Sequence, residues 1–249
     1  MFPRYSLPPR IVAGLARDLL TARRRSFRAD GLEFARRIQP PMCVIGAEHI
    51  PRAGPCVVTF NHYYRPGFNA WYMALALAAV VPVEMHFVMT GELTFPGKWY
   101  APPGMAVSKW LLARIGKTYG FTTMPPMPPR KKDIEARADA VRKALAFVRR
   151  NRNAILGLAP EGGDSPDGCL ARPASGSGRF ALLLAGLGLR VIPLGVYEEA
   201  GEFCLRFGPI YELRVPPGLS SDERDHAAAN ILMKHIAGLL PERLRGEFA

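Results

Sequence analysis

The sequence has few cysteines, and they form no recognisable metal or redox motif. Its 249 residues include only Cys43, Cys56, Cys169 and Cys204. No two of them form a Cys-x-x-Cys pair, and no histidine stands at zinc-finger spacing. This pattern excludes the small disulfide-stapled and zinc-finger classes. It predicts reduced thiols in a cytosolic protein and no metal site.

A long apolar run is also missing. The longest uncharged stretch lies between Arg65 and Glu84 and contains prolines at 66 and 82. Its helical part, residues 68–81, would span roughly 20 Å, which is short of the roughly 30 Å bilayer core. This stretch therefore predicts a core helix. The N-terminus lacks an apolar segment followed by small residues, so we expect no secretory signal and a cytoplasmic location.

Acidic residues are scarce relative to basic ones. There are 33 Lys and Arg against 21 Asp and Glu, a formal net charge of +12. Such a balance suits an anionic partner, namely a membrane surface, nucleic acid or an acidic acyl carrier, although a basic surface can simply keep a protein soluble. We expect no nucleic-acid partner, because no helix-turn-helix or RNA-recognition signature occurs. The Gly176-Ser177-Gly178 segment lacks the lysine of a nucleotide-binding loop and predicts the start of a helix.

The residues that are present favour one sizeable core. The chain is 49% hydrophobic, and short apolar strands alternate with helical patterns from residue 42 onward. This alternation predicts an α/β fold with a central mixed, partly parallel β-sheet flanked by helices. The expected strands cover 42–46, 56–60, 85–89, 154–159 and 190–196, with a hairpin at 202–213. The expected helices cover 68–81, 132–150, 179–188 and a last one capped by Ser220 and Glu223. Residues 98–124 give no clear pattern.

Residues 1–40 predict a separate N-terminal segment before a domain at 41–249. Within it, residues 10–29 predict one basic amphipathic helix, with Ile11, Leu15 and Leu19 in an apolar stripe and five arginines nearby. Such a helix suits the interface of an anionic membrane. Packing of the same stripe against the core is the alternative.

Two segments carry candidate chemistry. An apolar strand ends in Asn61-His62, where α/β folds place catalytic groups. A second strand runs into a glycine-rich turn, in which exposed amides suit an anion or oxyanion. The turn has the sequence Pro160-Glu161-Gly162-Gly163-Asp164.

Together these segments resemble the glycerolipid acyltransferase family, which includes the lysophosphatidic acid acyltransferases. Asn61-His62 resembles the start of its His-x4-Asp motif, and Pro160-Glu161-Gly162 resembles its Pro-Glu-Gly-Thr block. The entry strand and a Val-Ile-Pro-Val strand are matched by residues 44–51 and 191–196. A Glu-Leu pair between the first two motifs is matched by Glu92-Leu93. The resemblance spans roughly residues 43–215.

The resemblance implies that His62 acts as a general base, with Asn61 beside it. The base would help an acyl group move from acyl-CoA or acyl-carrier protein to a lysophospholipid or similar acceptor. The co-substrate is the only cofactor implied, and a peripheral position on the inner face of a membrane is expected. The predicted substrate-binding residues are Arg65, Glu161, Gly162, Gly163 and Asp164.

Three departures from the family pattern bear on activity. The motif aspartate is replaced by Gly67, the motif threonine by Gly163, and no arginine ends the segment 115–122. Arg65 beside His62 is a candidate for the missing phosphate contact. Glu161, Asp164 or a backbone carbonyl are candidates to orient the imidazole. A pseudoenzyme that binds lipid or acyl carrier without turnover is the alternative.

Overall fold

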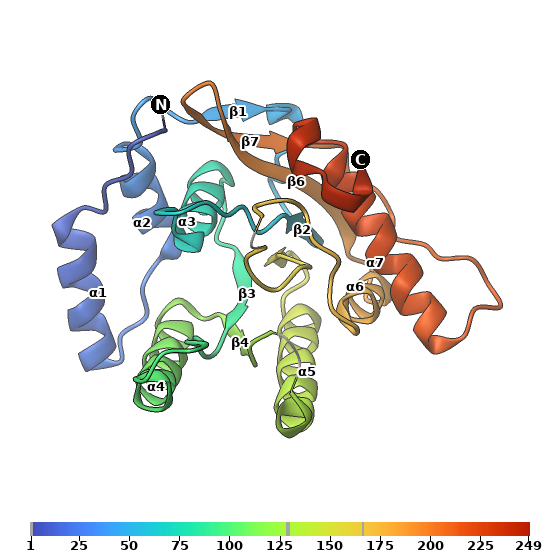
Figure 1. Cartoon of the computed structure of the whole chain (residues 1–249), viewed down its shortest axis with the longest axis horizontal. Helices are drawn as coiled ribbons and strands as arrows, with labels where there is room; N and C mark the ends of the chain where they lie inside the picture. The colour runs from blue at the N-terminus through green and yellow to red at the C-terminus, as the bar shows by residue number, and fades with distance from the viewer. Residues whose placement is uncertain (1, 128–129, 166) are drawn as a thin grey trace.

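A seven-stranded β-sheet forms the centre of the molecule (Figure 1). The computed structural model describes residues 2–127, 130–165 and 167–249. The strand order is β1-β7-β6-β2-β5-β3-β4, and the β6–β7 pair is antiparallel whereas the other pairs are parallel. The predicted mixed, partly parallel sheet is therefore confirmed. The strands are β1 (Cys43–Ile45), β2 (Cys56–Phe60), β3 (His86–Thr90), β4 (Thr122–Met124), β5 (Ile155–Leu158), β6 (Arg190–Glu199) and β7 (Glu202–Phe207).

Helices pack against the sheet and enclose two hydrophobic cores. Strand β2 is buried along its whole length, as expected for a central parallel strand. Its alternate residues serve different cores: Val58 packs with residues of α2 and α3, whereas Val57 packs with residues of α5 and α6. The α-helices are α1 (Pro9–Thr21), α2 (Phe27–Ala35), α3 (Ala70–Val80), α4 (Ala101–Tyr119), α5 (Ile134–Arg150), α6 (Ser177–Gly186) and α7 (Ser221–Ala237). Among the described residues, no helix combines the length and apolarity needed to cross a bilayer.

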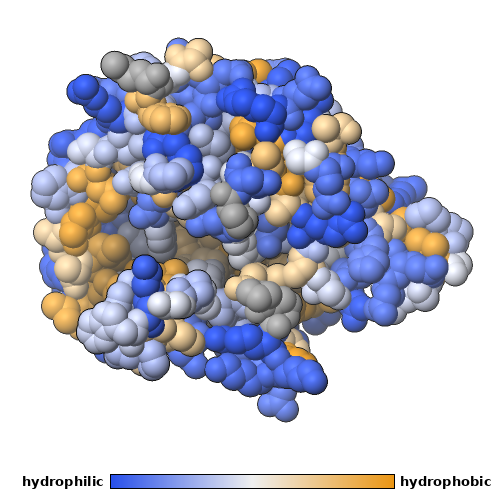
Figure 2. Space-filling model, in the orientation of Figure 1, coloured by the Kyte–Doolittle hydropathy of each residue, from blue (hydrophilic) through white to orange (hydrophobic). Residues whose placement is uncertain are grey.

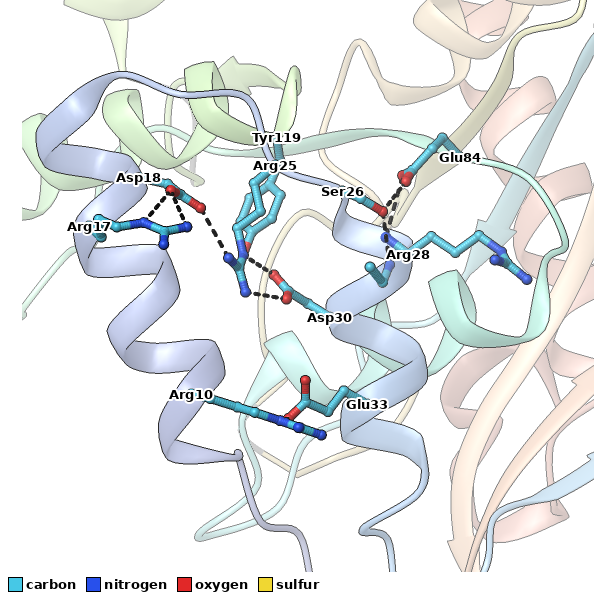
Figure 3. Close-up of polar contacts among 11 residues, drawn as sticks. Arg10, Arg17, Asp18, Arg25, Ser26, Arg28, Asp30, Glu33, Glu84 and Tyr119 are labelled. Carbon is cyan, nitrogen blue, oxygen red and sulfur yellow. Dashed lines mark hydrogen bonds and ion pairs between the residues drawn. The ribbon is translucent and has the colours of Figure 1, made fainter.

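The predicted single helix at 10–29 is wrong, because the chain breaks between α1 and α2. Ala22 adopts a left-handed conformation at the end of α1, and the Ser26 side chain caps α2 by accepting from the Ala29 N–H. Arg25, between the two helices, donates to Asp18 and Asp30 (Figure 3). This turn lets α2 pack on α3, so the N-terminal segment contributes to the main core.

The expected apolar stripe of α1 faces inward. Ile11 is buried, and Leu15 and Leu19 are half-buried. The exposed apolar residues of α1 are instead Val12 and Leu20, which are 56% and 78% exposed. Figure 2 shows apolar residues gathered along the margin formed by the N-terminal helices and around a hollow in this face.

One further expectation needed correction, and one segment without a prediction has a defined structure. Residues 98–124, which gave no clear pattern, form α4 and β4. The expected hairpin at 202–213 is instead made by β6 and β7, which pair from Leu194↔Phe207 to Glu199↔Glu202. The capping box at Ser220 and Glu223 is confirmed, with both reciprocal hydrogen bonds present.

Candidate active site

The sheet brings the two candidate segments together. Strands β2 and β5 are parallel neighbours, with Thr59 opposite Leu158. Their carboxyl ends therefore lie at the same edge of the sheet. Asn61-His62 follows β2 and the turn 160–164 follows β5, so these segments meet across this edge.

Asn61 joins β2 to β6. Its side-chain amide donates to the Val196 carbonyl at 2.8 Å and accepts from the Val196 N–H at 2.7 Å. Asn61 is buried. Its two side-chain hydrogen bonds to the Val196 backbone extend the β2–β6 pairing beyond the end of β2. Its polar atoms are thus used to fix the backbone just before His62, so any catalytic contribution of Asn61 would be indirect.

Glu161 holds the two segments in register. One carboxylate oxygen accepts from the His62 backbone N–H at 2.5 Å, and the other accepts from the Ala171 N–H at 2.8 Å. Burial raises the pKa of this carboxyl above its ordinary value, an effect that the two N–H donors partly oppose. Both oxygens are occupied by backbone donors. Glu161, predicted to bind substrate, therefore positions His62 in this structure.

The imidazole of His62 lies against a carboxylate from the same turn. Nδ1 of His62 is 2.7 Å from Oδ1 of Asp164. The two groups are not aligned as a hydrogen bond, and Nδ1 is buried with no hydrogen-bond partner among the described residues. The Asp164 side chain is half-exposed. The contact leaves Nε2 as the ring nitrogen available to a substrate.

The glycines shape the turn that carries Asp164. Gly162 has a positive φ of 74°, which favours glycine, and its N–H donates to the Ala159 carbonyl at 3.2 Å. A Cβ at Gly163 would meet nothing within 4 Å. A Cβ at Gly162 would instead lie 2.7 Å from the Met127 side chain, so Gly162 packs against Met127 whereas Gly163 faces open space.

A narrow apolar pocket borders this turn. Its volume is about 120 Å³, and it lies between the ends of β3, β4 and β5 and the helices α5 and α6. Gly162 contributes to its rim together with Pro160. The walls are mostly apolar and include Met89, Met124, Met127, Leu158 and Phe180. No sequence pattern identified these wall residues, because they come from strand ends, a loop and a helix that are far apart in the sequence.

The family model described as Acyltransferase matches residues 41–197. The chain belongs to the acyltransferase family. A search of curated proteins gives no match. Among solved structures, the 1-acyl-sn-glycerophosphate (LPA) acyltransferase of Thermotoga maritima is similar at 14% identity and a TM-score of 0.48, over 94% of this chain and 84% of that one.

Gly67 stands where the sequence resemblance places the motif aspartate. Gly67 has a φ of +80°, and a Cβ built on it would lie 3.7 Å from Nη1 of Arg65. Gly67 offers no side chain to His62, whereas Asp164 does. Of the three candidates to orient the imidazole, the structure favours Asp164.

Arg65 forms an ion pair with the buried carboxylate of Glu198. Its Nε and Nη2 donate to the two oxygens of Glu198 on β6 at 2.5 and 2.9 Å. These bonds raise the pKa of the Arg65 guanidinium. Two of the guanidinium nitrogens are thus engaged by Glu198, and the role of Arg65 in gripping a substrate phosphate stays a prediction. Glu198 was not identified from the sequence, although it follows the Val-Ile-Pro-Val-like strand by two residues.

One group of potential metal ligands exists among the described residues, on the neighbouring strands β1 and β7. The ligand atoms of Cys43, Glu202 and Cys204 lie within 4.8 Å of one another. Burial raises the pKa of the Cys204 thiol to about 12, which favours the protonated thiol over the thiolate that binds metals. This group lies away from the β2 and β5 ends and has no part in the candidate active site.

Proposed function

We propose that this acyltransferase moves a fatty acyl group from a thioester donor to the hydroxyl of a lysophospholipid or similar lipid acceptor. The observation that carries the proposal is the 2.7 Å contact between His62 and Asp164 at the shared edge of β2 and β5. A histidine beside a carboxylate, with one ring nitrogen free, is the arrangement that general base catalysis requires.

In the proposed reaction, Nε2 of His62 takes the proton of the acceptor hydroxyl. The hydroxyl oxygen then attacks the thioester carbonyl and forms a tetrahedral intermediate. Collapse of the intermediate breaks the carbon–sulfur bond and leaves an ester. The departing thiolate takes the proton from the imidazolium, so the histidine ends as it began.

Asp164 supplies the carboxylate that Gly67 lacks. It favours the tautomer with the proton on Nδ1 and stabilises the imidazolium that forms during transfer. In serine proteases, the loss of the comparable aspartate lowers turnover about 10⁴-fold. A half-exposed carboxylate is better solvated, so we expect a smaller effect here, on the order of 10- to 1000-fold.

The pocket beside Gly162 suits an acyl chain. Its mostly apolar wall matches a hydrocarbon, and its methionines can adapt to a flexible chain. Acyl-CoA and acyl-carrier protein are both acidic donors that the net charge of +12 would attract. The acceptor would come from an anionic membrane on whose inner face the protein acts peripherally.

The test is incubation of the purified protein with radiolabelled acyl-CoA or acyl-carrier protein and a panel of acceptors. We expect lipid product from wild type, none from His62→Ala, and reduced turnover from Asp164→Ala. Asp167→Ala is the matched control. Asp167 lies in the same loop, but its carboxylate contacts Ser165 and the Cys169 N–H.

Three outcomes would overturn the mechanism. A folded His62→Ala protein with full turnover would remove the general base. A larger loss in Asp167→Ala than in Asp164→Ala would show that the loop needs its carboxylates only for its shape. Binding of acyl thioester by wild type without turnover would establish the binding-only alternative, which the substitution of the motif aspartate by Gly67 supports.

A further inference from the structure

The outer face of α4 is unusually apolar for an exposed helix. Val107 and Trp110 are 63% and 55% exposed, and Arg114 follows at the spacing that places all three on one face. Trp99, in the turn just before the helix, is 91% exposed. Isolated apolar residues on a surface are ordinary, but two exposed tryptophans, one on α4 and one just before it, are not.

This face is continuous with the end of α1. Nη1 of Arg114 donates to the Leu19 carbonyl at 2.8 Å, and its guanidinium lies over the Trp110 ring at 4.8 Å. The next residue, Leu20, is largely exposed. Helix α4 lies beside the carboxyl-terminal end of α1 (Figure 1). We call the set Leu20, Trp99, Val107 and Trp110 the α4 surface.

The charged residues around the α4 surface are all positive. The sequence from residue 93 to residue 132 contains no aspartate or glutamate. The exposed cations on and beside the helix are Lys98, Lys109, Arg114 and Lys117. Tryptophans favour the boundary between lipid headgroups and acyl chains, where lysine and arginine can reach anionic headgroups.

We propose that the α4 surface docks on an anionic lipid bilayer, with Trp99 and Trp110 inserted at the headgroup boundary. Apolar and basic residues are interleaved on this surface, and an anionic membrane satisfies both. The surface differs from the Ile11, Leu15 and Leu19 stripe, which packs inward. This proposal rests on the proposed function in one respect: docking would bring the enzyme to a lipid acceptor that lies in the membrane.

Flotation of the full chain with vesicles tests the proposal. The vesicles are phosphatidylglycerol–phosphatidylcholine mixtures or phosphatidylcholine alone. We expect wild type to bind the anionic vesicles, and a Trp99→Ala/Trp110→Ala variant to bind them at least tenfold more weakly. Ile134→Ala/Leu183→Ala is the matched control, because it removes two exposed apolar side chains from α5 and α6, and it should bind like wild type.

Quenching by brominated lipids provides a second measurement. Tryptophan fluorescence of wild type should be quenched in anionic vesicles, and most of this quenching should disappear in Trp99→Phe/Trp110→Phe, which leaves Trp71. Equal flotation of wild type and the alanine variant would overturn the proposal. Binding of acyl-carrier protein but not vesicles through the same two tryptophans would also overturn it, in favour of an acidic protein partner.

Failure here is distinguishable from failure of the proposed function. Flotation needs no turnover, so an inactive protein can still dock. Conversely, a variant with a defective α4 surface should still acylate a short-chain acceptor dissolved as monomers, because its site around His62 is unchanged. Loss of turnover on that soluble acceptor would show that the two tryptophans serve the fold or the site, and would contradict the docking role.

Discussion

Glu198 organises a buried polar cluster beside the site. It accepts from Arg65 and from the hydroxyls of Tyr63 and Tyr5. Burial, followed by the nearby Glu198 charge, raises the pKa of Tyr63 to about 12, so the tyrosine remains a hydrogen-bond donor at any ordinary pH. A buried carboxylate with three donors is stable only while its cation is present.

Arg65→Met should therefore destabilise the protein. Both partners are largely buried, with side-chain exposures of 17% for Arg65 and 3% for Glu198. Removing one member of such a pair costs about 3–5 kcal/mol, because the other charge is left uncompensated. Urea unfolding of wild type and variant measures the difference. Unchanged stability together with a raised KM for a phosphorylated acceptor would instead support anion binding by Arg65.

Gly67→Asp tests whether the site already has its carboxylate. The positive φ of 80° at Gly67 should make the substitution cost about 1 kcal/mol. The new side chain would also start 3.7 Å from Nη1 of Arg65, which attracts it. Because Asp164 already contacts His62, we expect turnover to stay flat or fall while the melting temperature changes little. A tenfold rise in turnover would show that Asp164 does not orient the base.

At the scale of elements, His86 joins β3 to two neighbours. Its ring stacks on Phe147 of α5 with centroids 3.9 Å apart, and Nε2 lies 2.8 Å from Oγ1 of Thr122 on β4. Burial lowers the pKa of His86 from 6.5 to about 4. The packing of this edge of the sheet therefore requires a neutral imidazole.

This lowered pKa predicts a loss of stability in acid. Between about pH 6.5 and about pH 4 the unfolded chain binds a proton at His86 that the folded protein does not. Stability from this group is thus complete above pH 6.5 and falls by about 3 kcal/mol as the pH drops to about 4. His86→Gln removes this dependence, so the stability difference between wild type and variant should shrink as the pH falls. Parallel curves from urea unfolding at several pH values would contradict the assignment.

Elements with a strong local signal were predictable, and those governed by tertiary contacts were not. Strand β2 is a short continuous apolar run and helix α5 has a clear apolar period, and both lie within two residues of their expected bounds. The break after α1 was missed because it depends on Arg25 pairing with Asp18 and Asp30. Helix α4 was missed because Pro102 and Pro103 resemble loop residues, although prolines suit the first turn of a helix.

The site was predictable in its parts but not in its arrangement. The strand ends correctly indicated that His62 and the turn at 160–164 would meet. Which of the two turn carboxylates would reach the imidazole depended on the loop path after the positive φ of Gly162. The sequence alone also could not show that the Asn61 and Glu161 side chains are taken up by backbone groups.

At the scale of the whole molecule, the net charge of +12 should make the proposed membrane attachment sensitive to salt. Arg23 and Arg24 are exposed between α1 and α2, whereas Arg25 belongs to the buried network in Figure 3. Arg23→Glu/Arg24→Glu should weaken binding to anionic vesicles at low salt, since each basic residue contributes about 1 kcal/mol at such a surface. Arg25 is left intact to preserve the fold. Equal flotation of wild type and variant would show that this segment does not face the membrane.

The length of the two edge strands of the β-sheet affects whether copies of the protein can aggregate by strand pairing. The outermost strands, β1 and β4, are three residues long, although the central strands that they flank are longer. A backbone edge this short gives a second chain little to pair with, which is one way that proteins avoid strand-to-strand aggregation. Crowding of many copies on one vesicle should therefore not seed extension of the sheet from molecule to molecule.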